Sequence, residues 1–144
     1  MATGGRIIWH EPELDRILNS PEGPVGRDLQ RKAEVVTQGA KRRAPVSPDG
    51  SHGRPSGWMR SRIGWRITKD STGLVAIVES PATTPEGAPY PLFVELGTAP
   101  HIIESHGDYP LRDKYGNVFG KRVNHPGTDA QPYLRPALDD IRGM

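Results

Sequence analysis

The chain contains no cysteine and no long hydrophobic run among its 144 residues. The missing thiols exclude disulfide bonds and thiolate metal sites, but their absence fits both a cytosolic and an extracellular setting. No apolar stretch approaches the ~20 residues of a membrane span, and no apolar run follows a basic N-terminal region as in a signal peptide. We therefore expect a protein that is made and used in solution, with no membrane partner.

Apolar residues are also scarce, at 34% of the chain, whereas Gly and Pro number 17 and 15. A chain of this length suits one domain, residues 1–144, and at best buries about 68% of its unfolded surface. Long polar stretches should lower that fraction. We expect a single loop-rich domain that gains part of its stability from neighbouring subunits.

Two helices are expected in the N-terminal half. The clearer one runs from Pro24 to Arg43, where apolar side chains recur at spacings of three and four residues. Pro45 ends it, and the cations of its last turn suit the carbonyl end of a helix. A shorter helix is expected over Glu11–Leu18, within an N-terminal extension (residues 1–20) whose segment Arg6–Trp9 has the composition of an edge strand.

Strands are expected in the middle of the chain. Trp58–Thr68 and Leu74–Val78 predict an antiparallel hairpin joined by a five-residue turn. A second small hairpin is expected around residues 111–121, and Gln131–Ile141 predicts a final helix. This order favours an α+β fold, an antiparallel β-sheet with the long N-terminal-half helix and the C-terminal helix packed on it.

Three segments lack a clear period. Residues 46–57 and 98–130 are expected to form long loops or hairpin insertions, because they are rich in Gly, Pro and polar residues. Tyr90–Leu96 is short and apolar, and fits either a helical turn or a strand.

The sequence offers little for catalysis. It has no GxSxG elbow and no cysteine nucleophile, and the neighbouring acids Asp139–Asp140 suit a solvated helix face better than one site. Four residues have ligand chemistry, but they lack helical i, i+4 spacing and lie in Gly- and Pro-rich loops, so hinge or surface roles fit them better than a metal site. We expect no enzyme activity, no cofactor, no metal and no small-molecule substrate. These four residues are His101, His106, Asp108 and His125.

A basic segment runs from Lys41 to Arg66. It carries seven Lys and Arg against one Asp, a net charge of +6, whereas the whole chain carries +2. Tryptophans among arginines suit phosphate contact and base stacking, but a solvated strand face with buried tryptophans gives the same pattern, and no groove-reading motif is present. The segment is a candidate lining for a DNA passage through backbone electrostatics alone. The candidates are Lys41, Arg42, Arg43, Arg54, Arg60, Arg62 and Arg66.

Three blocks of sequence, in a fixed order, resemble one family. The first joins Ala-Lys-Arg-Arg-Ala-Pro-Val (residues 40–46) to Ser-Gly-Trp-Met-Arg-Ser-Arg-Ile (56–63). The second is Tyr-Pro-Leu-Phe-Val-Glu-Leu-Gly-Thr (90–98), and the third is His-Pro-Gly-Thr-Asp-Ala-Gln-Pro-Tyr-Leu-Arg-Pro-Ala-Leu (125–138). This pattern is similar to that of the HK97 gp10-like phage proteins, over roughly residues 24 to 142. A longer loop between the two parts of the first block, and Met59 in place of the usual Leu, depart from it.

The resemblance implies a structural virion protein of a tailed bacteriophage, of the kind described as head–tail connector, neck or tail-completion protein. We expect a homo-oligomeric ring, six-fold, at the neck or upper tail, assembled in the host cytoplasm. The ring would contact neighbouring neck and tail proteins and let double-stranded DNA pass through its lumen. A tail terminator of the same particle, and a free nucleic-acid-binding protein without sequence preference, are the alternatives.

A cyclic ring needs a heterologous interface built from two different patches of each subunit. We expect those patches in the 46–57 loop, the 95–101 segment and the terminal helix. Glu95, inside an apolar run, either pairs with an arginine of its own or a neighbouring subunit, or points to water. Gly97 suits the left-handed end of a short helix. The interface candidates are Phe93, Glu95, Gly97, Thr98, His101, His125, Tyr133 and Leu134.

Overall fold

A computed structural model of the chain describes residues 4–50, 53–113 and 115–144, so that parts of the expected 46–57 loop and of the expected second hairpin lie outside the described residues. The helices are α1 (Glu11–Asn19), α2 (Pro24–Arg43), α3 (Trp58–Arg62), α4 (Tyr90–Leu96) and α5 (Leu134–Ala137), the last continuing into the 3-10 turn η1 (Leu138–Ile141). The strands are β1 (Gly64–Asp70), β2 (Gly73–Glu79), β3 (His101–Glu104), β4 (Leu111–Arg112), β5 (Val118–Gly120) and β6 (Arg122–His125).

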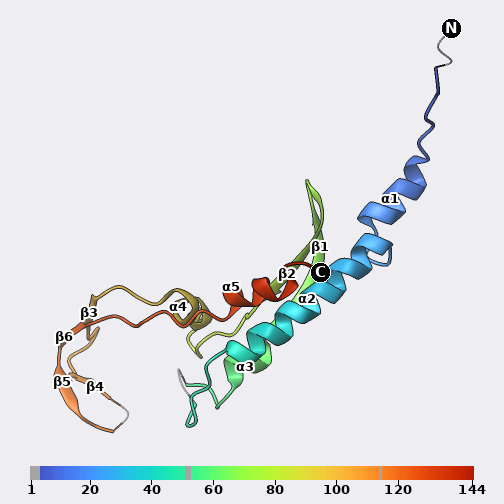
Figure 1. The fold of residues 1–144 in the computed structure, drawn as a ribbon. Helices are drawn as coiled ribbons and strands as arrows, with labels where there is room; N and C mark the ends of the chain where they lie inside the picture. The colour runs from blue at the N-terminus through green and yellow to red at the C-terminus, as the bar shows by residue number, and fades with distance from the viewer. Residues whose placement is uncertain (1–3, 51–52, 114) are drawn as a thin grey trace.

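The fold is α+β, which confirms the expected class. Helix α2 contacts both strands of the β1–β2 hairpin and also α5 and η1, so the long helix is the element on which the body is assembled (Figure 1). Within the described residues, the strand pairs are all antiparallel and form three separate two-stranded sheets, β1–β2, β3–β6 and β4–β5. None of the helices in the described ranges combines the length and the apolar character that a membrane span requires.

The core lies where α2 meets α3 and α5. The apolar stripe of α2 supplies Val36 and Ala40, which pack with Met59 and Ile63 from the α3 region and with Tyr133 before α5. Val36 and Ala40 are 3% and 0% exposed. A buried set this small supports little independent stability, because the free energy of folding grows with the apolar area removed from water.

The strand expected over Trp58–Thr68 is wrong in its first half, because Trp58–Arg62 forms α3. The helical turn buries Met59, and the N–H of Ser61 donates to the carbonyl of Gly57 at 2.9 Å. Gly57 precedes the helix with a φ of 73°, a left-handed conformation that glycine adopts without strain. These five residues show neither a clear helical period nor a clear strand alternation, so the sequence alone does not decide between the two. Packing against α2 favours the helix.

The first hairpin is confirmed, but its turn is shorter than the expected five residues. Asp70 pairs with Gly73, so only Ser71 and Thr72 connect the strands. The carboxylate of Asp70 accepts the backbone N–H and the hydroxyl of Thr72 at 2.7 and 2.6 Å. This Asx-type turn lets the ladder continue to the end of the strands.

The two ends of the chain also differ from expectation. Arg6–Trp9 forms no strand, since no other described strand lies beside it, and residues 4–10 are all exposed (Figure 1). The C-terminal helix begins at Leu134 and not at Gln131, and the N–H of Gln131, outside the helix, donates to the carbonyl of Val94 at 2.8 Å. Pro132 follows and has no N–H to donate.

Residues 98–130 form a projecting arm. The chain leaves α4, runs outward through β3 and returns through β6, with β4 and β5 at the far end (Figure 1). The expected small hairpin is confirmed as β4–β5. The β3–β6 pair, in which His101 lies opposite His125 and Glu104 opposite Arg122, was not expected, because four-residue strands separated by a long insertion carry no local signal.

Candidate interaction surfaces

Glu95 holds the start of α5. Its Oε2 accepts the backbone N–H groups of Tyr133 and Leu134 at 2.7 and 2.9 Å, and its Oε1 accepts that of Arg135 at 2.9 Å. The first N–H groups of a helix have no partner within the helix, so a carboxylate there satisfies them and meets the positive end of the helix dipole. Neither expected role, an arginine pair or a solvent-facing acid, describes this contact.

The protonation of Glu95 follows from these contacts. Partial burial raises the pKa of this carboxyl group, but the N–H groups of Leu134, Tyr133 and Arg135, with the nearby Arg135 charge, outweigh burial and leave the pKa below its ordinary value of 4.5. Glu95 is therefore a carboxylate near neutral pH. It joins α4 to α5 across the base of the arm.

Gly97 and Thr98 fix the base of the arm. Gly97 ends α4 with a φ of 71°, and its N–H donates to the carbonyl of Phe93 at 2.8 Å, as the expected helix end requires. A Cβ at Gly97 would lie 2.6 Å from the carbonyl oxygen of Thr128. Thr98 and Thr128 exchange backbone hydrogen bonds of 3.0 and 3.1 Å, so only glycine allows the two chain segments to approach this closely.

His101 and His125 lie together on the arm. Their ring centroids are 5.0 Å apart, and the Nδ1 atom of His125 accepts the N–H of Gly127 at 3.1 Å. His101 Nδ1 lies 2.9 Å from the carbonyl oxygen of Ala99. Within the described residues no three His, Asp or Glu side chains gather as metal ligands. The pair therefore packs the two arm strands at their base.

The remaining interface candidates separate into buried and exposed side chains. Tyr133 is 0% exposed and belongs to the core, where burial and the Glu95 charge raise its pKa to about 12. Leu134 is partly buried against that core. Phe93 is 47% exposed and is the most open to solvent of these three candidates.

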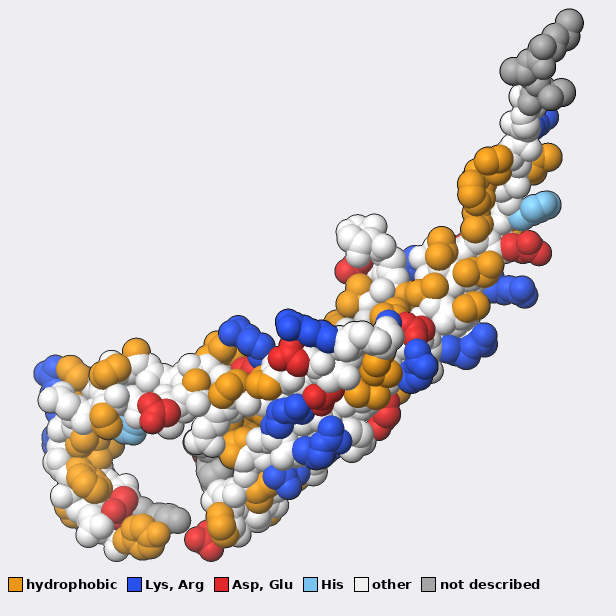
Figure 2. Space-filling view, viewed as in Figure 1, with side chains coloured by type: hydrophobic (Ala, Val, Ile, Leu, Met, Phe, Trp, Pro, Cys, Tyr) orange, Lys and Arg blue, Asp and Glu red, His pale blue; other side chains and the backbone are white. Residues whose placement is uncertain are grey.

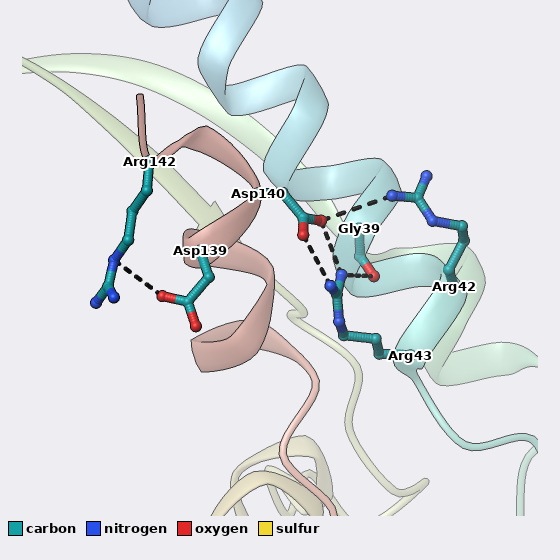
Figure 3. Close-up of polar contacts among 6 residues, drawn as sticks. All are labelled: Gly39, Arg42, Arg43, Asp139, Asp140 and Arg142. Atoms are coloured by element: carbon teal, nitrogen blue, oxygen red, sulfur yellow. Dashed lines mark hydrogen bonds and ion pairs between the residues drawn. The ribbon is translucent and has the colours of Figure 1, made fainter. Parts of the chain in front are cut away.

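Arg43, in the basic segment, ties α2 to the C-terminal turn (Figure 3). Its two Nη atoms donate to the two oxygens of Asp140 at 2.8 and 2.7 Å, and Nη1 also donates to the carbonyl of Gly39 at 3.1 Å. Hydrogen bonding to Arg43 lowers the pKa of Asp140 below its ordinary value, and the same bonds raise that of Arg43. The expectation of a solvated Asp139–Asp140 face is therefore wrong for Asp140.

The acidic neighbour makes a different contact. Asp139 pairs with Arg142 at 3.0 Å, so the two adjacent carboxylates face different arginines, as helical geometry requires (Figure 3). Arg42 reaches Asp140 at 3.6 Å. A Cβ at Gly39 would collide with the Asp140 carboxylate, so a glycine at this position of α2 admits the ion pair.

Two further arginines bind backbone carbonyls of their own chain. Arg54 donates to Thr83 and Thr84 at 2.9 and 3.2 Å, which joins the 46–57 loop to the segment after β2. Arg60 donates to the carbonyl of Ala44 at 2.7 Å, beyond the end of α2. Both guanidinium groups thus satisfy backbone acceptors that lack partners in helices or strands.

The other basic residues are more open to solvent or to a partner. Arg62 stacks over the Trp58 ring at 4.2 Å, and Arg66 pairs with Glu79 across the first hairpin at 3.0 Å. The side chain of Lys41 makes no hydrogen bond or ion pair with the described residues. Most residues of the basic segment are therefore engaged in contacts within their own fold.

A pocket that the sequence did not indicate lies beyond the C-terminal end of α2. It has a volume of about 200 Å³, and Thr128, Asp129 and Gln131 belong to its lining. Three segments far apart in sequence bring apolar walls together, so no local pattern foretells the pocket. Its apolar walls include Val46, Trp58, Met59, Tyr90, Phe93 and Val94.

The arm exposes apolar side chains that the sequence reading did not single out. None of the described residues from Leu92 to Pro132 is buried. Hydrophobic side chains are visible along the arm and on the N-terminal segment (Figure 2). The most apolar of those on the arm strands, with their exposed fractions, are Ile102 at 47%, Ile103 at 37%, Val118 at 57% and Phe119 at 53%.

Comparison of the chain with models of protein families, with curated proteins and with solved structures found no match.

Proposed function

We propose that this chain is a structural ring subunit of a tailed bacteriophage, located at the head–tail neck or upper tail. The ring joins head to tail and lets double-stranded DNA pass, and its subunits catalyse no reaction. We expect six copies. The three sequence blocks that resemble the gp10-like phage proteins support a role in a tailed phage particle. The projecting arm is the structural observation that supports assembly with other subunits.

The arm supports this proposal through its poor internal packing. A two-stranded hairpin alone in water is marginally stable, and this arm is built of two such pairs. Its strands expose unpaired edges together with apolar side chains, a combination that monomers usually avoid. Contact with neighbouring subunits would cover both features.

The charges support a passage for DNA more than tight binding. Three of the seven candidate cations are hydrogen-bonded within the chain, which lowers the number that are fully available to neutralise phosphates; these are Arg43, Arg54 and Arg60. Weak, non-specific attraction suits a lumen through which DNA must slide. A free nucleic-acid-binding protein would rely on such cations, so their engagement within the fold favours the ring over that alternative.

Sedimentation of the purified full-length protein over a range of concentrations tests the assembly. We expect a closed oligomer whose mass is a multiple of the 15.8 kDa chain. DNA binding measured at several salt concentrations should be weak, with a shallow dependence on salt. A persistent monomer that binds DNA tightly, with an affinity that falls steeply as salt rises, would favour the free nucleic-acid-binding alternative.

A further inference from the structure

The N-terminal tail, residues 4–10, presents three neighbouring large apolar side chains to solvent. Ile7, Ile8 and Trp9 are 74%, 68% and 67% exposed, and the tail has no regular structure. Figure 2 shows the tail projecting beyond the body with hydrophobic side chains along it. An exposed apolar cluster of this kind usually marks a contact with another molecule.

The pocket beyond α2 has the size for a single side chain. Its volume of about 200 Å³ lies below the roughly 300–1,000 Å³ of pockets that hold small-molecule ligands. Aromatic walls from Trp58, Tyr90 and Phe93 suit an inserted ring, since aromatic pairs stabilise beyond the area that they bury. The indole of Trp9 is the largest exposed apolar group of the tail.

The fold prevents a chain from filling its own pocket. The pocket walls begin at Pro45, just after α2, whereas the tail leaves from the far end of α1 (Figure 1). At 1.5 Å per residue, the 20 residues of α2 alone span about 30 Å. Trp9 is two residues from α1, a reach of about 7 Å. The occupant must therefore come from another molecule.

Charge complementarity favours a second copy of this chain. Arg6, beside the apolar cluster, and Asp129, at the pocket, are both exposed. Neither side chain has a hydrogen bond or ion pair with another described residue. Opposite charges at matching ends of the two surfaces would guide the tail to the pocket and fix its direction.

We propose that Trp9 of one copy inserts into the pocket of the next copy, with Arg6 directed toward Asp129 of that copy. Tail and pocket are different patches, one before α1 and the other beyond the C-terminal end of α2, so the contact is heterologous and closes into a ring when the rotation between copies allows. The inference rests on the proposed ring and assigns its contacting residues.

Crosslinking of two single-cysteine variants tests this contact, because the chain has no cysteine of its own. His10→Cys places a thiol beside an intact Trp9, and Gln131→Cys places one at the pocket. The two purified full-length variants are mixed and treated with a short bismaleimide. In the control, His10→Cys is mixed instead with Ser71→Cys, which lies at the exposed tip of the first hairpin. We expect the covalent heterodimer in severalfold higher yield from the Gln131→Cys mixture than from this control.

Adding Trp9→Ala to the His10→Cys variant should reduce the crosslink yield to that of the control. In a second experiment, Asp129→Arg alone and Arg6→Asp alone should each weaken assembly. The double variant, which restores opposite charges, should recover it. A yield equal to the control, in a sample that sediments as a ring, would overturn the tail contact and leave the proposed ring intact. A monomer at every concentration, with no crosslink, would contradict both.

Discussion

Glu95 shows how a single residue serves two elements. Its carboxylate bonds three consecutive N–H groups at the start of α5, and it does so from α4, 38 to 40 residues earlier in the chain. An acid inside an apolar run suggests a positively charged partner elsewhere in the chain. Here the partner is the start of α5, whose aligned N–H groups carry partial positive charge. The residue therefore connects the base of the arm to the core through Tyr133.

Replacement of Glu95 by Gln should reduce the free energy of unfolding by about 1 kcal/mol near neutral pH, the scale of a lost helix cap. Only one oxygen of the amide can accept, and its NH2 group would face N–H donors. Chemical denaturation followed by circular dichroism measures the difference. Glu95→Asp, the matched variant, should lose less stability than Glu95→Gln, because it keeps the negative charge that faces the N–H groups.

The same contact has a predictable dependence on pH. Because the pKa of Glu95 lies below its ordinary value of 4.5 in the folded chain, its stabilising effect is complete above that value and is lost as pH falls through the folded pKa. The stability difference between the parent chain and Glu95→Gln should therefore shrink between pH 5 and the lower pKa. A difference that stays constant over this range would contradict the capping role.

At the scale of elements, the Arg43–Asp140 pair connects the last turn of α2 to η1, 97 residues apart. It is bidentate and lies over Gly39, whereas Asp139 makes a single contact within its own turn. Bidentate pairs between elements restrict more of the chain than pairs within one helical turn. The C-terminal turn is thus held by α2 and not by its own helical propensity.

Asp140→Ala should destabilise the protein more than Asp139→Ala, which removes an acid of the same chain segment without detaching η1 from α2. Thermal unfolding of the two variants compares them directly. Added salt should reduce the effect of Asp140→Ala, because it screens the pair. Equal melting temperatures for the two variants would show that the pair contributes nothing that Asp139 does not.

The arm is the second element with a separable role. Phe119→Ser removes an apolar side chain that is 53% exposed, so the stability of the isolated subunit should change by less than about 0.5 kcal/mol. Assembly should weaken, seen as a higher concentration needed for the oligomer in sedimentation. Leu18→Ser on α1, where the side chain is 51% exposed, is the control. Equal assembly of both variants would remove the arm from the interface.

Sequence patterns predicted the elements whose signal is local. The apolar period of α2, the prolines around it and the first hairpin appear directly in the chain. The five residues of α3 have no clear period. Strands β3 and β6 pair with each other, but β4, β5 and their connections separate them in sequence. Tertiary packing determines the secondary structure of both regions, because the intrinsic propensities of so few residues are too weak to determine it.

The candidate site residues likewise divide into those with a local sequence signal and those whose contacts depend on the fold. Gly97 was predictable, because a positive φ at a helix end demands glycine. The partners of Glu95, Asp140 and Arg54 were not, since each reaches a segment far away in sequence. The pocket also required the fold, because its walls come from three separate segments.

At the scale of the whole molecule, a small core and a long exposed arm fit the proposed ring subunit, whose arm neighbouring copies would cover. The body is built on α2, and the tail and the arm project from it (Figure 1). Such a shape offers large contact surfaces for a chain of modest length. It suits a ring in which each copy covers the apolar groups of the next.

Electron microscopy of phage particles that lack this protein tests the central claim most directly. If the chain forms the ring that joins head to tail, the mutant should accumulate DNA-filled heads separate from finished tails, and supply of the protein should restore whole particles. Tails of irregular length would indicate the tail-terminator alternative. Normal, intact virions in the absence of the protein would contradict the account.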